Sequence, residues 1–501
     1  MKDLKNAFLA RKTWHNNRSS TVFPCFNSNA TVHYLVFQNY WSWKSKIQAD
    51  QIRVVIHLYN SEGVALETKE FDVDSHNCIN LNEEFSVSFD NSQDPPNLSS
   101  FEVEIISLRN LGFPFPGVML FCEDKKSGEV TCVHSGGRRL NSNEARYLKK
   151  YTETNWLAIQ NQYFTPFFHV FNDSVELLSD NERMAEVSVN RNCGKHSPFN
   201  ATVDLGVAPF WSKVFYIKDI FSQKVLDQIN GKEIWIEVQF KTTAFPRMIV
   251  GNYDLLQDFH YITHSFGKVE SRDYIQSSVP GEVTSFLPLL NALPLNLKAK
   301  SYPTNAPSTV KSIIYEYPPA SEVNQKSSEP HVFESRGDAI NSFENNSTSM
   351  KLYNIVGKCP ARLNVSYNYS LQNSRHPTDI ATGFKSKDYL PKESHWGHGV
   401  CKKDFRTLIF VRNISHSNEE SNSALPIIID IELFNRVLSK SISLQIPSSG
   451  WNFIEINPEV DFVLGKEFFS WRFKDKISTR METFWVSYNI HTGAICGEHG
   501  F

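Results

Sequence analysis

The sequence contains few cysteines and no long apolar runs. Its eight cysteines in 501 residues form no C-x-x-C pair, which favours free, buried thiols in a reducing compartment over a disulfide framework. No stretch approaches the roughly 20 apolar residues of a membrane helix, and the first residues lack the apolar core of a secretory signal. We therefore expect a soluble, cytoplasmic protein without a membrane span, with export by a non-classical route as the alternative.

The sequence also lacks the usual signatures of charged partners and of common enzymes. The net charge of −3 is spread without a long run of either sign, so we expect no nucleic-acid partner. The chain has no G-x-S-x-G elbow, no phosphate-binding G-x-x-x-x-G-K-[ST] loop, no dinucleotide fingerprint and no H-E-x-x-H. These absences lower the expectation of an enzyme without removing it, because sandwich enzymes build their sites from scattered residues.

Aromatic residues are abundant and indicate strands rather than helices. They make up 13% of the chain, with 37 Phe and 18 Tyr, and aromatic side chains favour pleated, half-buried surfaces. Strand hairpins are predicted over 52–73 and 426–446, with further strands at 101–108 and 233–240. Helical periodicity is scarce, and residues 142–156 are the best helix candidate.

A segment with the pattern of a hairpin recurs four times along the chain. The tetrapeptide Val-Ser-Tyr-Asn, which begins at residue 365 and again at 486, first reveals the repeat. Its last position is held by an anchor residue in each copy, namely Asp124, Asp254, Asn368 and Asn489, spaced by 130, 114 and 121 residues. Ten residues after the anchor, three copies carry His134, His264 and His499. The third copy has four extra residues, and Thr382 replaces the histidine.

A second motif precedes each hairpin at about the same period. Its copies are YLVFQN (34–39), WLAIQN (156–161), FLPLLN (286–291) and LIFVRN (408–413). The closing asparagines are spaced by 122, 130 and 122 residues. Two motifs that share so long a period indicate tandem domains, because solenoid repeats are usually 20–50 residues long.

The pattern within each repeat predicts an immunoglobulin-like fold. Roughly six to eight short strand candidates closed by a hairpin are typical of an antiparallel β-sandwich. The sequence thus predicts an all-β protein with little helix, made of four tandem β-sandwich modules of about 120 residues each. The predicted modules are 1–145, 146–275, 276–404 and 405–501. The third is irregular, because residues 303–350 are rich in Pro, Ser and Asn and are predicted to form a long loop with at most one short strand.

Glycine predicts the turn of each hairpin. Gly128 and Gly493 lie four residues after their anchors, as in a three-residue loop whose glycine is left-handed. Asp258 holds this position in the second copy, and aspartate tolerates a positive φ better than most residues. Cys122 and Cys132 would then face each other across the first hairpin, as a reduced pair in the cytosol or as a disulfide if oxidised.

The repeated polar residues have a structural and a functional interpretation. The asparagines that close the opening motifs are expected to be buried and bonded to loop backbone rather than to contact a ligand. They are Asn39, Asn161, Asn291 and Asn413. The repeated histidines are expected to serve the fold, since tandem domains hold equivalent residues far apart unless the modules fold together. Convergence of the histidines on one site is the alternative.

The region around the third hairpin concentrates chemically able side chains. His395, His398 and Cys401 have the spacing His-x-x-His-x-x-Cys and the ligand types of a zinc or copper site. This spacing matches no established zinc finger, so the sequence predicts no cofactor and keeps the metal site as an alternative. Together with Trp396 and with His376 in the longer third hairpin, these histidines form the predicted binding site, because sandwich loops commonly carry function.

The leading functional expectation is a non-catalytic interaction or structural protein that presents sandwich loops to another protein or to a glycan. Exposed tryptophans at Trp41 and Trp43 would stack on sugar rings, although packing in the core is the favoured interpretation. The rival hypothesis is an enzyme, with or without a metal, whose site lies at a module interface around residues 376–401. The oligomeric state is left open by the sequence.

Overall fold

The computed structural model is mostly β-strand, arranged in several antiparallel sheets with a few short helices. The structure describes residues 16–26, 28, 30–85, 98–134, 136–141, 144, 148–154, 158–174, 176–191, 197–243, 247–267, 282–286, 298–303, 310–316, 331–334, 347–354, 364–383, 394–413, 426–446, 451–461, 468–477 and 481–501. Within these ranges, no helix combines the length and the hydropathy needed to cross a bilayer. The chain divides into unit 1, residues 1–268, and unit 2, residues 269–501, which are described separately.

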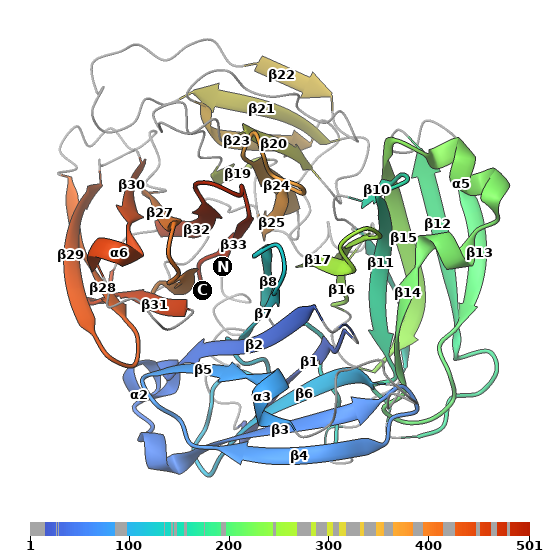
Figure 1. Cartoon of the computed structure of the whole chain (residues 1–501), viewed down its shortest axis with the longest axis horizontal. Coiled ribbons are helices and arrows are strands. Elements are labelled where there is room, and N and C mark those ends of the chain that lie inside the picture. Colours follow the sequence, from blue (N-terminus) through green and yellow to red (C-terminus); the bar gives the residue numbers. More distant parts are fainter. Residues whose placement is uncertain are drawn as a thin grey trace. The chain divides into compact units, whose positions relative to one another are not determined.

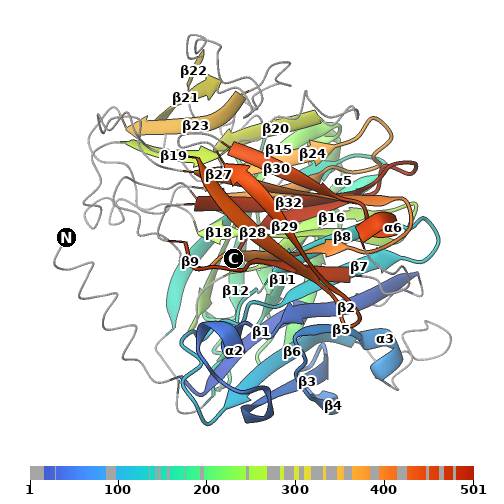
Figure 2. The ribbon, with the colours of Figure 1, turned by 90° about the vertical axis from the view of Figure 1, so that its left-hand side faces the viewer.

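The first half of unit 1 contains two antiparallel sheets, whose blue and cyan strands can be followed in Figures 1 and 2. Sheet 1 has the order β1-β6-β3-β4, and sheet 2 has the order β5-β2-β7-β8. Their strands are β1 (Arg18–Pro24), β2 (Thr31–Gln38), β3 (Ile52–Asn60), β4 (Ala65–Phe71), β5 (His76–Asn80), β6 (Leu98–Ser107), β7 (Met119–Asp124) and β8 (Val130–His134). The helices are α2 (Tyr40–Lys44), η1 (Ala49–Gln51) and α3 (Leu81–Glu84). The predicted hairpin over 52–73 is confirmed as β3 and β4, joined at a turn where Gly63 has a φ of 83°.

The second half of unit 1 contains two further sheets. Sheet 3 has the order β13-β12-β15-β9-β18 with β10 also on β15, and sheet 4 has the order β14-β11-β16-β17. The strands are β9 (Lys149–Thr154), β10 (Ala158–Gln160), β11 (Phe164–Phe171), β12 (Met184–Arg191), β13 (Phe199–Asp204), β14 (Ser212–Tyr216), β15 (Lys232–Thr242), β16 (Ile249–Asp254), β17 (Phe259–His264) and β18 (Phe266–Gly267). The helices are α4 (Ile217–Ile220) and α5 (Gln223–Ile229). The helix predicted over 142–156 is wrong at β9, because pairing with β15 overrides a weak helical preference.

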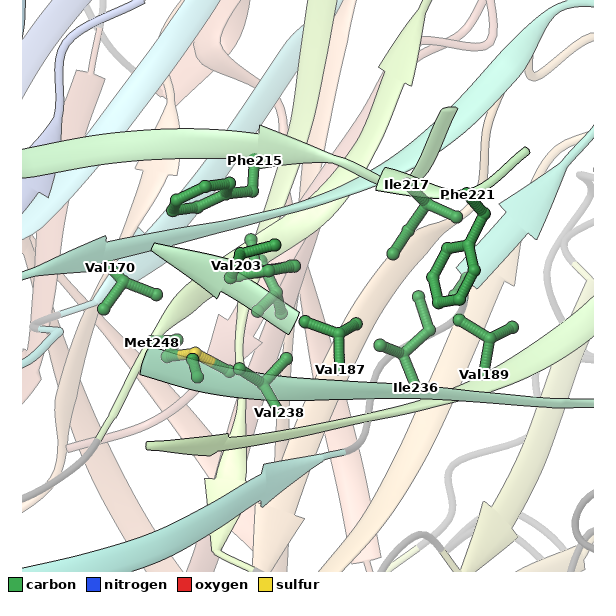
Figure 3. Close-up of a cluster of buried hydrophobic side chains, with 14 of the residues drawn as sticks. Val170, Val187, Val189, Val203, Phe215, Ile217, Phe221, Ile236, Val238 and Met248 are labelled. Carbon is green, nitrogen blue, oxygen red and sulfur yellow. The ribbon is translucent and has the colours of Figure 1, made fainter. Parts of the chain in front are cut away.

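Sheets 3 and 4 face each other across one hydrophobic core. The alternation of β12 directs Ala185, Val187 and Val189 inward, where they pack with Val238 of β15. Val170 and Phe215 of sheet 4 enter the same cluster, and Figure 3 shows these side chains between the two layers. This arrangement is the two-layer packing that a half-buried antiparallel sheet requires.

The described residues of unit 2 form four antiparallel sheets. Their orders are β19-β23-β21-β22 (sheet 5), β20-β24-β25 (sheet 6), β26-β31-β28-β29 (sheet 7) and β30-β27-β32-β33 (sheet 8). The strands of sheets 5 and 6 are β19 (Glu282–Phe286), β20 (Lys298–Pro303), β21 (Val310–Glu316), β22 (His331–Glu334), β23 (Ser347–Asn354), β24 (Asn364–Ser370) and β25 (Thr378–Gly383). Those of sheets 7 and 8 are β26 (Trp396–Val400), β27 (Phe405–Asn413), β28 (Ile427–Phe434), β29 (Ser439–Ile446), β30 (Trp451–Ile456), β31 (Phe468–Phe473), β32 (Met481–Asn489) and β33 (Ile495–His499), with helix α6 (Pro458–Asp461). The long loop predicted over 303–350 is wrong, since β21 and β22 lie within it.

Three of the four repeated anchor residues are the first residues of side-chain-capped turns, whereas Asn368 lies within β24 and pairs with Asp379 of β25. The Asp124 carboxylate accepts a hydrogen bond from Lys126 N at 3.0 Å. The Asp254 carboxylate accepts from the second and third residues after it, at 2.8 and 3.1 Å, and the Asn489 amide oxygen does the same at 2.9 Å for both bonds. Only Asp and Asn carry an oxygen on a side chain short enough for this Asx turn. These three anchors therefore fix where the hairpins of sheets 2, 4 and 8 reverse.

The left-handed turn residues are confirmed at all three described positions of this type. The φ angles are 72° at Gly128, 55° at Asp258 and 77° at Gly493. The loop is one residue longer than predicted, because Asp124 N donates to Glu129 O and closes the ladder around four loop residues. The longer loop shifts the register of the first hairpin, so Cys122 pairs with Thr131 rather than facing Cys132.

The cysteine pair predicted across the first hairpin is therefore wrong. Cys132 pairs with Phe121, the neighbour of Cys122, and adjacent rungs of a ladder direct their side chains to opposite faces. Both cysteines are buried. Burial also raises the pKa of the Cys122 thiol, which keeps it protonated at neutral pH.

In sheets 2, 4 and 8, the strand next to the hairpin pairs with it in the same register relative to the anchor. Asp124 pairs with Thr31 of β2, Asp254 with Phe164 of β11, and Asn489 with Phe405 of β27. Eight residues after these partners come Asn39, Asn172 and Asn413. YLVFQN and LIFVRN thus lie on corresponding strands. WLAIQN instead includes β10 of sheet 3, so its assignment as the counterpart is wrong, and the corresponding segment is FFHVFN (167–172).

The asparagines that close these strands are bonded to loop backbone where their bonds are resolved. Asn39 is 4% exposed and accepts a hydrogen bond from Ser42 N at 3.2 Å. Asn172 is 5% exposed, accepts from Ser174 N and donates to Ala208 O. Asn413 is also buried, whereas Asn161 is half-buried and caps the turn before β11. Asn291 lies outside the described residues, as does all of FLPLLN except Phe286, the last residue of β19.

The substitution Gly493→Ala is expected to destabilise the protein more than Gly128→Ala. Both glycines have a positive φ, where an added Cβ costs about 1–2 kcal/mol. At Gly128 this Cβ meets nothing within 4 Å, whereas at Gly493 it would lie 2.5 Å from Asn373 Oδ1 and 2.7 Å from Ser374 N. Urea unfolding should therefore show that the unfolding free energy falls by about 1–2 kcal/mol in Gly128→Ala and by about 2–4 kcal/mol in Gly493→Ala. Equal losses would contradict the close packing at Gly493.

Candidate functional site

The predicted binding residues of the third repeat lie in the interior of unit 2. His376, His395, Trp396 and His398 are each at most 4% exposed. The Trp396 ring stacks on Phe501 with 4.2 Å between ring centroids, and the two residues also pair through their backbones. These side chains are therefore packed against the fold of their own unit.

The structure does not bring His395, His398 and Cys401 together. Residues alternate between the two faces of a strand, so side chains three positions apart around β26 lie on opposite faces. His398 Nδ1 is 3.0 Å from the Ser470 hydroxyl, and His395 Nδ1 is 3.4 Å from Thr483 Oγ1. Burial raises the pKa of the Cys401 thiol to about 11, so the thiol is protonated at neutral pH.

The longer loop of the third hairpin packs on the hairpin turn of sheet 8. Asn373 Nδ2 donates to His491 O, and Ser374 Oγ donates to Gly493 O at 2.8 Å. His376 Nδ1 lies 2.6 Å from Pro377 O, within the loop itself. By register, Thr382 pairs with Val365, three residues before the anchor, so it does not replace the repeated histidine in space.

Two of the repeated histidines, His134 and His264, lie side by side in unit 1. The sequence analysis expected equivalent residues of tandem domains to be far apart. Each lies opposite the residue five positions before its anchor, as His134 with Met119 and His264 with Ile249. Strands β8 and β17 adjoin, and Thr131 Oγ1 accepts a hydrogen bond from Ile262 N at 2.9 Å. This contact places the rings of His134 and His264 edge-to-face with 4.3 Å between centroids. We refer to His134 and His264 as the histidine pair.

Local contacts orient both members of the histidine pair. His264 Nδ1 lies 3.1 Å from Ser265 O, and its ring meets the edge of Phe266. His134 Nε2 lies 2.6 Å from Arg247 Nη1. A guanidinium only donates hydrogen bonds, so His134 Nε2 accepts this one and the imidazole is neutral. The pair is 4% and 1% exposed.

Arg247 also lines a small cavity beside β11 and β15. The cavity offers ≈ 20 Å³ for the centres of water-sized molecules, and its polar lining includes His169, Asp173 and Thr242. Asp173 accepts hydrogen bonds from the Thr242 hydroxyl and from Thr243 N. Burial, together with the charge of Arg139, lowers the pKa of His169 to about 3, so its imidazole is neutral at physiological pH. A volume of this size suits one or two water molecules.

Near this cavity, a buried arginine joins the two halves of unit 1. Arg139 is 0% exposed and donates through Nη2 to Ser100 Oγ at 3.1 Å and to Phe210 O at 2.9 Å. Its guanidinium lies 4.2 Å above the Tyr59 ring, and Nη1 is 3.8 Å from Glu102 Oε2. A buried charge is stable only with such partners. Because Ser100 belongs to β6 and Phe210 precedes β14, Arg139 links sheet 1 to the loop before β14.

Arg18 continues this network along the outer face of sheet 1. It pairs with Glu102 at 3.2 Å, with Glu144 at 2.9 Å and with Glu104. His57 Nε2 is 2.9 Å from Glu104 Oε2. Burial alone would raise the pKa of Glu104, but the hydrogen bond from His57 and the charge of Arg18 outweigh it and hold the pKa at about 2. We refer to Arg139, Glu102, Arg18, Glu104 and their partners as the ion-pair cluster.

The sequence carried only a weak signal for these residues. Arg138 and Arg139 follow Gly136-Gly137 directly after the first hairpin, and two adjacent arginines at most 6% exposed are unusual in a core. Neither His169 nor Arg247 was among the candidate site residues predicted from the sequence. Trp41 is 0% exposed, as the core interpretation predicted, whereas Trp43 is half-buried on α2.

Comparisons with known proteins place the chain in no family. A scan against models of protein families matches none of them, and a search of the curated proteins finds no similar sequence.

The substitution Glu104→Gln is expected to destabilise unit 1 by about 2 kcal/mol at pH 7, with the loss shrinking as pH falls. The pKa of Glu104 is depressed in the folded chain, so its stabilisation is complete above pH 4.5 and disappears as pH falls through about 2. Denaturant unfolding between pH 7 and pH 3 measures this trend. Glu70→Gln is the control, because Glu70 is 61% exposed in its pair with Arg53 and should change stability by less than about 0.5 kcal/mol.

Proposed function

We propose that this chain is a non-catalytic interaction or structural protein made of four tandem immunoglobulin-like β-sandwich modules. Support for the repeat comes from the hairpins of sheets 2, 4 and 8, which share one register and one type of Asx turn. Sheet 6 also ends in a hairpin, β24-β25, whose first strand pairs with an earlier strand, β20. Arrays of sandwiches commonly hold their loops in fixed positions for recognition.

The ion-pair cluster is the observation that carries the structural part of this proposal. It places charged groups where two halves of unit 1 meet, with Arg139 bonded to Ser100 on one side and to Phe210 on the other. Neighbouring bonds add to this seam, including one from the Ser99 hydroxyl to Ser212 O at 2.6 Å. Buried charges and polar groups have few alternative arrangements that satisfy them, so this junction favours a fixed angle between modules.

The proposed partner is another protein or a glycan. Of the two tryptophans considered for sugar stacking, only Trp43 is partly exposed, and the adjacent Lys44 lies over the ring of the exposed Phe113. An aromatic ring supplies a flat apolar face that suits the C–H faces of sugars as well as protein side chains. The region 376–401 remains the alternative location for an enzymatic site.

Arg139→Met should loosen the junction and lower thermal stability. It leaves Glu102 with one fewer positive partner in a site without water, and we expect a loss of about 3 kcal/mol in the unfolding free energy. Limited proteolysis and small-angle X-ray scattering should then report a less compact chain. Arg183→Met is the control, since Arg183 is 31% exposed and its surface pairs are worth less than about 1 kcal/mol. An unchanged Arg139→Met variant would remove the support for a rigid junction.

A glycan array and chemical cross-linking with the intact chain separate the two classes of partner. If a glycan binds, Trp43→Ala should weaken its affinity about tenfold. Leu108→Ala, at a residue that is 93% exposed elsewhere on the surface, should leave that affinity unchanged. Stoichiometric zinc or copper that is lost on replacing His395 and His398 with alanine would instead support an enzyme around 376–401 and count against the non-catalytic proposal.

A further inference from the structure

We propose that the histidine pair, His134 and His264, binds a divalent transition-metal ion such as zinc. The two imidazoles come from the ends of corresponding strands, β8 and β17, and their rings meet at 4.3 Å with an interplanar angle of 78°. A ring nitrogen of one lies within 4.8 Å of a ring nitrogen of the other. Two nitrogens at about 2.0–2.1 Å from a tetrahedral zinc are about 3.3 Å apart, so a small rotation of one ring closes the geometry.

The environment of His264 sets the tautomer that a metal ion needs. Its Nδ1 faces Ser265 O at 3.1 Å, and a carbonyl only accepts hydrogen bonds, so the proton is on Nδ1. The lone pair is therefore on Nε2. Metal-binding histidines usually donate their other ring N–H to a carbonyl or a carboxylate in this way. The Ser265 hydroxyl donates in turn to Glu153, which is 1% exposed, so the carbonyl is held on a rigid segment.

Arg247 is the competitor for the second ligand. It donates to His134 Nε2 at 2.6 Å and so occupies a lone pair that a metal ion requires, while its charge repels a cation. Arg247 and Asp173 both line the small cavity beside the pair, so a carboxylate is part of the surroundings of the guanidinium. Metal binding thus exchanges an arginine hydrogen bond for a coordinate bond and requires no proton to leave His134.

The donor set favours zinc, copper or nickel over calcium or magnesium. Imidazole nitrogens suit borderline transition metals, whereas magnesium and calcium prefer oxygen ligands. The pair supplies two ligands, and water or further donors complete the coordination. A role for these histidines in the fold alone predicts no dependence of stability on metal ions.

Zinc titration of the intact chain tests the proposal. Chelator-treated protein is titrated with Zn²⁺ in a calorimeter, and bound metal is measured after gel filtration. We expect one ion per chain, with the affinity falling on the order of 100-fold in His134→Ala and in His264→Ala. His491→Ala is the matched control, because its side chain is 68% exposed in a hairpin turn and its loss should leave the affinity unchanged.

Arg247→Met provides the second variant and keeps both imidazoles. Removing the competing guanidinium should tighten zinc binding about tenfold, which no purely structural role for the pair predicts. Circular dichroism checks that each variant is folded. The proposal is overturned if zinc fails to bind the parent chain, if both alanine variants keep the parent affinity, or if Arg247→Met weakens binding.

Discussion

The Asx turn is the constraint on which the arrangement of these sheets depends. In sheets 2, 4 and 8, a short side-chain oxygen on the anchor accepts backbone N–H groups of the turn and so fixes the residue at which the hairpin reverses. Once the reversal is fixed, the register follows for the whole hairpin, since a slip by one residue would turn every side chain to the wrong face. The histidine ten residues after the anchor therefore has one position on its sheet.

The position of the repeated histidine brings two imidazoles together where sheets 2 and 4 adjoin. In unit 1 the contact of β8 with β17 sets His134 beside His264, and Arg247 links this pair to the polar cavity. The same junction buries Arg139, whose partners come from both halves of the unit. The repeated histidine has a place in each hairpin by itself. Where the two hairpins of unit 1 dock, His134 and His264 come together as two possible metal ligands.

The rigid junction and the metal hypothesis are compatible. The proposed fixed angle between the two halves of unit 1 would hold the two imidazoles at a short and constant distance, which is the preorganisation that a binding site needs. Burial also lowers the pKa of His33 to about 4 and that of His169 to about 3, so both imidazoles are neutral in the folded chain at physiological pH. Acidification should lower the unfolding free energy of the chain. The reason is that these histidines bind a proton more readily in the unfolded chain than in the folded one.

The sequence alone determined what depends on local backbone sterics. The Gly and Asp turn residues, the anchors and the strand hairpins are short-range features, and a positive φ or an Asx turn needs only its own neighbours. It did not determine which segments pair, so WLAIQN was matched to the wrong strand, and it did not foresee the burial of His395 and His398. Those outcomes, like the meeting of His134 with His264, were decided by the packing of one sheet on another, because burial and long-range contacts arise only when distant segments dock.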